Sequence, residues 1–227
     1  MGTVIITEHT TKYPITLIGE MAGVCWGGDT SNSIKNYKRG IDCLENEHGR
    51  TFEFPDVYAI LDGYSARAIR EWYTHIGGMP TRLQASTRYI DYEHGFDFVT
   101  PPSILSIDEA REVYDIMMQF IQTSLTKLDE LGIPREDSAL GLPLGMTTKV
   151  VDKRNLRNLI DMSHQRKCTR AYHEYRTLFR DFENGLRNYS EEWAYLVDHY
   201  FEPKCKYMGF CKEKKSCGLM PKRGDVA

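Results

Sequence analysis

The chain has 227 residues, of which 41% are hydrophobic and 27% charged, and its formal net charge is −3. This length allows one large domain or two small ones, and the lack of a glycine- or serine-rich linker favours one compact domain. A net negative charge argues against general nucleic-acid binding, and no apolar run approaches the roughly 20 residues that span a membrane. The first residues lack the basic and apolar regions of a signal peptide, which predicts a cytoplasmic protein. If the protein is virus-encoded, the cytoplasm would be that of the host cell.

The hydrophobic pattern predicts short strands followed by longer helices. Residues 13–19 are mostly apolar and end in glycine, which suits a short strand, and residues 51–54 alternate in the same sense. Ser65 is the predicted N-cap of a helix over residues 66–75, which the Gly77–Gly78 pair ends. We therefore expect the first third of the chain to mix both element types.

Two longer helices are predicted further on. Residues 106–109 read as a capping box, which opens a helix that Gly132 stops. A second helix is expected over residues 155–184, and Ser190 starts a shorter one. The first of these helices has an apolar stripe that we predict to be core, formed by Val113, Ile116, Met117, Phe120, Ile121, Leu125 and Leu128.

Two polar segments indicate an anion-rich ligand. Residues 85–89, Ala-Ser-Thr-Arg-Tyr, offer hydroxyl, backbone N–H and guanidinium donors within one short loop, which suits a phosphate or carboxylate. The run from Asn155 to Ala171 sets Arg157, Arg166 and Arg170 along the predicted helix. Together the two segments predict a ligand that carries negative charge.

The six cysteines are predicted to be thiols rather than disulfides. Three of them, Cys205, Cys211 and Cys217, recur at equal spacing in a lysine-rich tail. They lack the Cys-x2-Cys knuckle and an obvious fourth ligand that zinc would require. We therefore assign no metal from the sequence, and the question stays open.

The Ser-x-Arg-Tyr loop at 86–89 and the Asn-x-Arg…Arg pattern from Asn155 to Arg166 resemble those of the flavin-dependent thymidylate synthase family. The resemblance extends from Glu47 to Cys217. It implies an α+β fold, a single compact domain with a mostly antiparallel sheet flanked by long helices, assembling as a homotetramer. On this view residues 1–203 form the synthase-like domain and residues 204–227 form a cysteine- and lysine-rich tail.

The resemblance also implies an activity, the reductive C5 methylation of dUMP to dTMP. In the family, reduced FAD supplies the hydride, methylenetetrahydrofolate supplies the carbon, and NADPH recharges the flavin. The protein then positions three flat ligands and polarises the base. The expected partners are a pyrimidine deoxynucleotide monophosphate and further copies of the chain, with no nucleic acid and no membrane.

Site residues follow from the same resemblance, position by position. Arg166 would contact the pyrimidine and act in catalysis, because a permanently charged, planar guanidinium suits negative charge on a carbonyl oxygen. The other predicted substrate residues are Glu71, Gln84, Ala85, Ser86, Thr87 and Arg88. The predicted FAD residues are Glu47, His75, Asn155, Arg157 and Asp161.

The chain departs from the family pattern in three places. The Arg-His-Arg signature is Thr74-His75-Ile76 here, and the usual phosphate-binding arginine is Ala139, which leaves open whether Lys149 or another cation replaces it. Glu71 stands where the family has glutamine, and a carboxylate suits a ring with an amino group, which favours cytosine over uracil. Alternatives to dUMP methylation are therefore a methylase or hydroxymethylase acting on dCMP, an enzyme that makes hydroxymethyl-dUMP, and a non-catalytic homologue that binds flavin or nucleotide.

Purely structural roles compete with these assignments. Ser86 could cap a turn, and Arg166 could form a surface ion pair. His75 could end a helix, and Asp161 could pair with Arg157 one turn earlier. The positions of these side chains in the fold separate the two readings.

Overall fold

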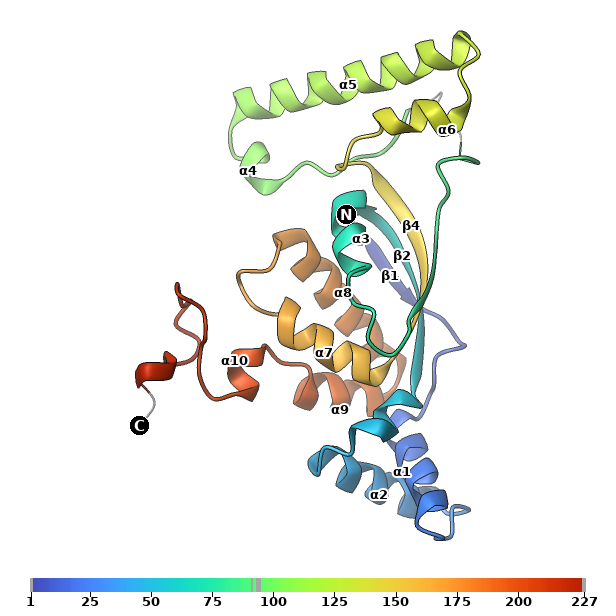
Figure 1. Cartoon of the computed structure of the whole chain (residues 1–227), viewed down its shortest axis with the longest axis vertical. Helices are drawn as coiled ribbons and strands as arrows, with labels where there is room; N and C mark the ends of the chain where they lie inside the picture. Colours follow the sequence, from blue (N-terminus) through green and yellow to red (C-terminus); the bar gives the residue numbers. More distant parts are fainter. Residues whose placement is uncertain (1, 91, 93–94, 226–227) are drawn as a thin grey trace.

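An antiparallel sheet of four strands organises the computed structural model, which describes residues 2–90, 92 and 95–225 (Figure 1). Its strand order is β1-β2-β4-β3. The strands are β1 (Thr3–Ile6), β2 (Asp56–Ser65), β3 (Thr81–Gln84) and β4 (Thr147–Asn155). The predicted α+β class with a mostly antiparallel sheet is confirmed.

Helices make up most of the remaining chain. They are α1 (Pro14–Cys25), α2 (Ser33–Glu45), α3 (Ala66–Trp72), α4 (Pro102–Leu105), α5 (Asp108–Glu130), α6 (Arg135–Ser138), α7 (Leu156–Arg166), α8 (His173–Tyr189), α9 (Glu191–Tyr200) and α10 (Lys204–Tyr207), with 3-10 turns at Gly49–Glu53, Ala139–Gly141 and Arg223–Asp225. Among the described residues, none of these helices combines the length and the apolar character that crossing a membrane requires.

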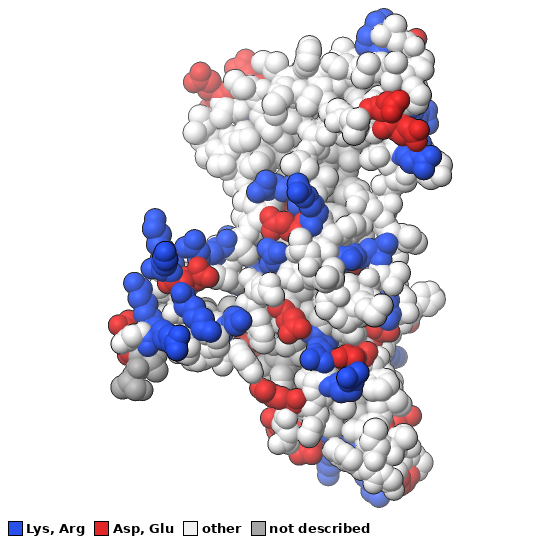
Figure 2. Space-filling view, in the orientation of Figure 1, with Lys and Arg blue, Asp and Glu red and all other residues white. Residues whose placement is uncertain are grey.

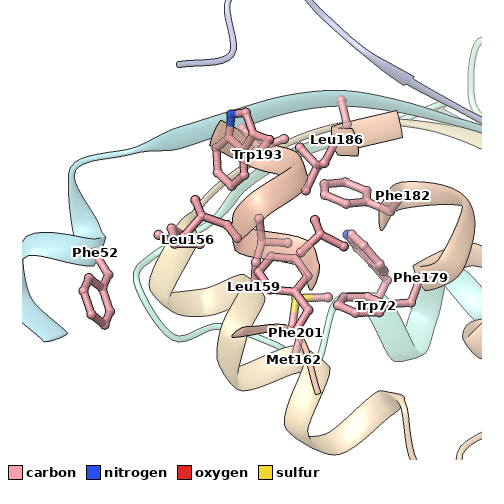
Figure 3. Close-up of a cluster of buried hydrophobic side chains, with 14 of the residues drawn as sticks. Phe52, Trp72, Leu156, Leu159, Met162, Phe179, Phe182, Leu186, Trp193 and Phe201 are labelled. Atoms are coloured by element: carbon pink, nitrogen blue, oxygen red, sulfur yellow. The ribbon is translucent and has the colours of Figure 1, made fainter. Parts of the chain in front are cut away.

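The main core lies between one face of the sheet and helices α3, α7, α8 and α9. On β2, Val57, Ala59 and Leu61 are fully buried and alternate with half-buried residues, as expected when one face of a strand packs on helices. Figure 3 shows the aromatic part of this core, in which Trp72 of α3 lies close to Phe179 and Phe182 of α8. This packing fixes α3 and α7, which carry much of the candidate site.

The opposite face of the sheet carries a row of apolar side chains. Ile5 pairs with Ile60, Ile60 with Val151, and Val151 with Leu83, so these four residues point to the same side. Ile5, Val151 and Leu83 are 54%, 47% and 72% exposed. An exposed apolar row of this kind marks a surface suited to association.

The apolar stripe of α5 was predicted to be core, and in the chain by itself this is wrong for most of the stripe, although Leu125 is buried and Ile121 packs against a small second cluster. Only Met118 and Leu125 are buried on this helix, whereas Val113 and Phe120 are 63% and 73% exposed. The reason is that α5 stands apart from the main core, over α4 and α6 (Figure 1), and its buried side meets only a small second cluster that includes Phe96 and Met146.

The strand predicted over residues 13–19 is instead the start of α1, with Pro14 at its first turn. Gly19 does not end a strand. A Cβ there would lie 1.8 Å from the carbonyl oxygen of Asn36, and one at Gly40 would lie 2.0 Å from that of Ile15. The two glycines therefore permit α1 and α2 to cross in close contact.

Three further predictions about elements were wrong in part. Residues 51–53 belong to a 3-10 turn rather than a strand, and Phe54 follows that turn as its C-cap. The helix predicted over 155–184 is two helices, α7 and α8, with a break between them. The capping box did not form, because α5 has Ile107 as its N-cap and no side-chain cap bond. In contrast, Ser65 accepts a hydrogen bond from the Ala68 N–H at 3.1 Å, which confirms it as the N-cap of α3.

Candidate functional site

Arg166, the last residue of α7, is held by the C-terminal end of α3 and the residues after it. Its Nε donates to Nε2 of His75 at 2.8 Å, and its two terminal nitrogens donate to Glu71 Oε2 at 2.9 Å and to Thr74 Oγ1 at 3.3 Å. The guanidinium also lies 4.6 Å from the ring centre of Tyr175. The structure thus brings together the predicted catalytic Arg166, substrate residue Glu71 and cofactor residue His75.

His75 is neutral in this arrangement. Burial, followed by the positive charges of Arg166 and Arg154, lowers the pKa of His75 to about 4. Because its Nε2 accepts the hydrogen bond from Arg166, the proton of the neutral ring is on Nδ1. His75 is therefore an acceptor that orients the guanidinium, and not a helix-ending cation.

A hollow of about 350 Å³ opens beside this cluster. Its lining includes His75 and Asp161, two of the predicted FAD residues, together with Asn158 of α7 and Lys204 from the start of α10. The remaining lining residues are Thr74, Ile76, Gly77, His164 and Gln165. The hollow thus joins the end of α3 to the exposed side of α7.

The other predicted FAD residues lie near the start of α7. Asn155 caps this helix by accepting from the Asn158 N–H at 2.9 Å, and its amide donates to the carbonyl of Gly78 at 3.4 Å. Arg157 donates to Glu53 at 2.6 Å, and a Cβ on Gly49 would lie 3.8 Å from its guanidinium carbon. Arg157 thus lies against the turn that follows Glu47.

Glu47 itself has a left-handed backbone, with a φ of 54°, and its carboxylate accepts from the hydroxyl of Tyr207 in α10 at 3.1 Å. Tyr207 also stacks on His164 with a ring separation of 4.9 Å. The tail therefore touches a predicted FAD residue directly.

Beneath the site lies a buried charge pair that the sequence reasoning missed. Arg154 donates to both oxygens of Asp152, at 2.5 and 2.7 Å, and to Asn158 at 2.7 Å, and its guanidinium lies 4.4 Å from the Trp72 ring centre. Both side chains of the pair are fully buried. The sequence did contain a signal for this pair. Burial alternates with a period of two over residues 147–155, which places Asp152 and Arg154 on the same face of the strand as the buried Val150.

A second buried carboxylate fixes the start of α3. Glu174 of α8 accepts from the backbone N–H of Ser65 at 2.6 Å and from its hydroxyl at 2.5 Å. Glu174 was not among the site residues predicted from the sequence. In the fold it anchors the helix that carries Glu71.

The predicted substrate loop lies at the other end of β3. The Gln84 amide donates to the Thr148 hydroxyl at 3.3 Å, and the Ala85 N–H donates to the carbonyl of Lys149 at 2.8 Å. The Ser86 hydroxyl accepts from the Arg88 N–H at 3.3 Å, and Arg88 pairs with Glu136 at 3.0 Å. Ser86 thus caps a turn here, which is compatible with its holding a ligand as well.

Thr87 lines a small hollow of about 20 Å³ that also includes Ala139 and Arg135. This is room for about one water molecule. Arg135 therefore lies beside the position where the family carries its phosphate arginine. Lys149, the other candidate cation, instead pairs with Asp62 at 2.6 Å.

Among the residues that the structure describes, the two halves of the predicted site line separate hollows. The hollow beside Arg166 and the one beside Thr87 have no described lining residue in common. Figure 1 shows the chain after β3 rising towards α6, whereas α7 lies among the helices below. A ligand that contacts both halves would need one of them to come from another copy of the chain.

Fold and side-chain geometry together define an α+β protein in which Arg166, Glu71 and His75 form one hydrogen-bonded cluster. The chain belongs to the Thy1 family, described as thymidylate synthase complementing protein, whose profile matches residues 6–188. This confirms the family resemblance of the two motifs.

Among curated relatives, the flavin-dependent thymidylate synthase of Geobacter sulfurreducens is 31% identical over 119 residues, covering 52% of this chain and 50% of that protein. The synthase of the same name from Pyrococcus horikoshii is 32% identical over 148 residues, which cover 61% of this chain and 57% of that protein. The chain thus spans about half the length of the curated relatives it matches.

Solved structures support the fold. The flavin-dependent thymidylate synthase ThyX of Helicobacter pylori, complexed with FAD and dUMP, has a TM-score of 0.70 at 18% identity and covers 88% of this chain and 100% of its own. PolB of Streptomyces cacaoi, a UMP/dUMP methylase bound with 5-Br dUMP, also has a TM-score of 0.70, at 14% identity. The match covers 88% of this chain and 96% of PolB. At these identities the likeness concerns the fold alone.

Proposed function

We propose that this protein is a flavin-dependent thymidylate synthase that methylates C5 of dUMP with methylenetetrahydrofolate, using NAD(P)H and FAD. The observation that carries the proposal is the Arg166 cluster. A guanidinium fixed by Glu71 and by neutral His75 stands at the edge of a hollow lined by predicted FAD residues. Membership of the Thy1 family supports the same activity.

The hollow has the character of a cofactor site. Its volume of about 350 Å³ falls within the range of roughly 300–1,000 Å³ that small-molecule pockets occupy. His75 and Asp161 from its lining would contact FAD, with Asn155, Arg157 and Glu47 along the adjoining side of α7. When bound, FAD supplies the hydride that completes the methyl group.

Arg166 would contact the pyrimidine and stabilise negative charge on its carbonyl oxygen. A guanidinium has five N–H donors, and the hydrogen bonds to His75, Glu71 and Thr74 use three of them. Donors therefore remain for a base. Neutral His75 accepts from the Nε–H of Arg166, and the charge of the buried Arg154 helps to keep the pKa of His75 low.

Ser86, Thr87 and Arg88 would hold the nucleotide phosphate, with Gln84 and Ala85 beside the sugar or base. We propose Arg135 as the cation that replaces the family arginine at Ala139, because Thr87, Ala139 and Arg135 line one hollow. That hollow is small in the free chain, so the loop would open when the phosphate binds. Residues 1–203 would form the catalytic domain and 204–227 a separate tail.

A homotetramer would bring the two halves of the site together. The exposed apolar row on the open sheet face and the exposed stripe of α5 supply surfaces that a second copy could cover. Light scattering tests the assembly and should give four times the 26.3 kDa chain mass. Changing both Leu83 and Val151 to lysine should lower this mass, and an unchanged tetramer would exclude the sheet face from the interface.

A related activity is favoured by one specific observation. Glu71, in place of the family's glutamine, is ion-paired with Arg166, the residue that would contact the base. A carboxylate accepts hydrogen bonds only, which suits the amino group of cytosine. The second candidate is therefore a pyrimidine nucleotide C5 methylase or hydroxymethylase acting on dCMP, or one that makes hydroxymethyl-dUMP.

Product analysis separates the candidates. Protein purified without added flavin should be yellow or take up FAD, and incubation with NADPH, methylenetetrahydrofolate and dUMP should yield dTMP by mass spectrometry. Product from dCMP alone, or a hydroxymethyl mass on dUMP, would select the second candidate. Protein that takes up FAD but turns over neither nucleotide would be a non-catalytic homologue, and failure to bind FAD would overturn both enzyme proposals.

A further inference from the structure

Four of the six cysteines line one hollow beside the tail. Cys168 comes from the loop after α7, Cys205 lies in α10, and Cys211 and Cys217 follow in the tail. All four are free thiols, and the hollow between them measures about 280 Å³. Cys168 is the fourth sulfur that the spacing of the tail cysteines did not reveal, because it lies in a distant part of the sequence.

The four thiols are near neighbours in the fold. Cys168, Cys211 and Cys217 are all close enough to act electrostatically on the Cys205 thiol. The Leu219 backbone and the Thr169 side chain lie close to the Cys217 thiol. Gly218, between Cys217 and Leu219, has a left-handed backbone with a φ of 86°, which forms a tight turn next to this thiol.

The surroundings carry the charge that a metal–thiolate centre requires. A divalent ion bound by four thiolates has a net charge of −2, and nearby cations favour the thiolate form. The lining of the hollow includes Lys167, Arg170, Lys204, Lys212 and Lys215. Its one carboxylate among the described lining residues, Glu213, pairs with Arg170 at 3.0 Å. Figure 2 shows the lysines and arginines gathered over the tail.

Hydrophobic burial does not account for the folded shape of the tail. Between residues 204 and 225, Cys211 is the only buried residue, yet its N–H donates to the Pro221 carbonyl at 2.7 Å and closes the tail into a loop. Small units without an apolar core are commonly stabilised by disulfides or by a structural metal. Four thiols in one cationic hollow favour the metal.

We infer that Cys168, Cys205, Cys211 and Cys217 bind one zinc ion as four thiolates. Each thiol loses a proton to solvent as its sulfur–metal bond forms, so binding releases up to four protons and changes no oxidation state. No three His, Cys, Asp or Glu side chains of the described residues are already arranged to hold a metal. Binding therefore draws the four sulfurs inward from the walls of the hollow.

The metal would also order one wall of the candidate functional site. His164, Gln165 and Lys204 line both this hollow and the one beside Arg166. Tyr207, which lies between Cys205 and Cys211 in the sequence, contacts Glu47 and His164. Fixing Cys205 and Cys211 to Cys168 would hold Tyr207 and Lys204 in place.

The test is the metal content of the full chain, purified under reducing conditions without chelator. Elemental analysis should find one zinc per chain, and refolding with Co²⁺ should give the visible absorption bands of tetrahedral thiolate coordination. Replacing any one of the four cysteines by serine should remove the zinc. Cys25→Ser is the matched control, because Cys25 is exposed and lies in α1, and it should keep a full equivalent.

A second readout does not depend on how well the variants fold. Zinc removal from the wild-type protein by a strong chelator should expose the lysine-rich tail to trypsin, while the rest of the chain stays resistant, and added zinc should restore protection. Zinc content near zero, iron with labile sulfide in its place, or a disulfide among these cysteines would each overturn the proposal. So would full zinc retention by the Cys168→Ser variant.

Discussion

Replacing Arg166 by alanine should lower turnover by about 10²–10³-fold while leaving most FAD binding intact. The change removes hydrogen bonds to His75, Glu71 and Thr74, of which the shortest are 2.8 and 2.9 Å. Charge-assisted hydrogen bonds contribute about 1.5–3 kcal/mol each when buried, but the Arg166 and Glu71 side chains are 20% and 27% exposed. We therefore expect the free energy of unfolding to fall by only about 1–3 kcal/mol in total.

The effect on catalysis should be larger than that on stability. Loss of one preorganised donor to a developing oxyanion costs about 10²–10³ in kcat. FAD affinity, measured by flavin absorbance, should stay close to that of wild type because Arg166 is not among the described residues that line the hollow. Arg187→Ala is the matched control, since Arg187 pairs with Asp198 at 2.8 Å on the surface of α8 and α9.

A spectroscopic readout accompanies the kinetics. The charge of Arg166 contributes to the low pKa of His75, so in the alanine variant this pKa should rise above about 4, yet stay below 6.5 because burial is the larger cause. Titration of the His75 ring by NMR measures it. Equal losses of FAD binding and turnover, or a His75 pKa that does not move, would refute the assigned role of Arg166.

Two further changes test the buried Arg154–Asp152 pair and the low pKa of His75. Asp152→Ala leaves Arg154 buried without its charge partner and should lower the free energy of unfolding by about 3–5 kcal/mol, measured by urea unfolding. Asp62→Ala is the control: it breaks the exposed pair with Lys149 and should lower the free energy of unfolding by about 1 kcal/mol or less. Because the folded pKa of His75, about 4, lies below its ordinary value of 6.5, the unfolded chain binds more protons between these pH values. Stability should therefore be full above about pH 6.5 and fall by up to ~3 kcal/mol towards pH 4, and His75→Gln should flatten this slope; a slope that the variant leaves unchanged would belong to another group.

Local sequence signals predicted the parts of the fold that depend on neighbouring residues. Ser65 and Ser190 were identified as helix starts, and both side chains cap their helices. Gly19 was misread because a glycine after an apolar run also ends a strand. Gly19 instead permits close contact between α1 and α2 at Asn36. This contact depends on a residue distant in the sequence, which the local pattern around Gly19 does not reveal.

The same limit applies to the candidate site. The resemblance selected Arg166, His75 and Glu71 separately, but their mutual hydrogen bonds depend on how α7 packs against α3. Arg154 was missed because helix was assigned from residue 155 onward and the strand before it was not read with a period of two. The role of Cys168 depends likewise on the tail returning to the loop after α7.

Subunit complementation tests most directly whether the Arg166 cluster and the Ser86 loop form one nucleotide site across two copies of the chain. Arg166→Ala and Ser86→Ala proteins would be purified separately, mixed under mild dissociating conditions and reassembled. We predict that dTMP formation by the mixture clearly exceeds the sum of the two parents, because some sites then combine an intact Arg166 with an intact Ser86. A reassembled mixed oligomer with no gain in activity would contradict the account.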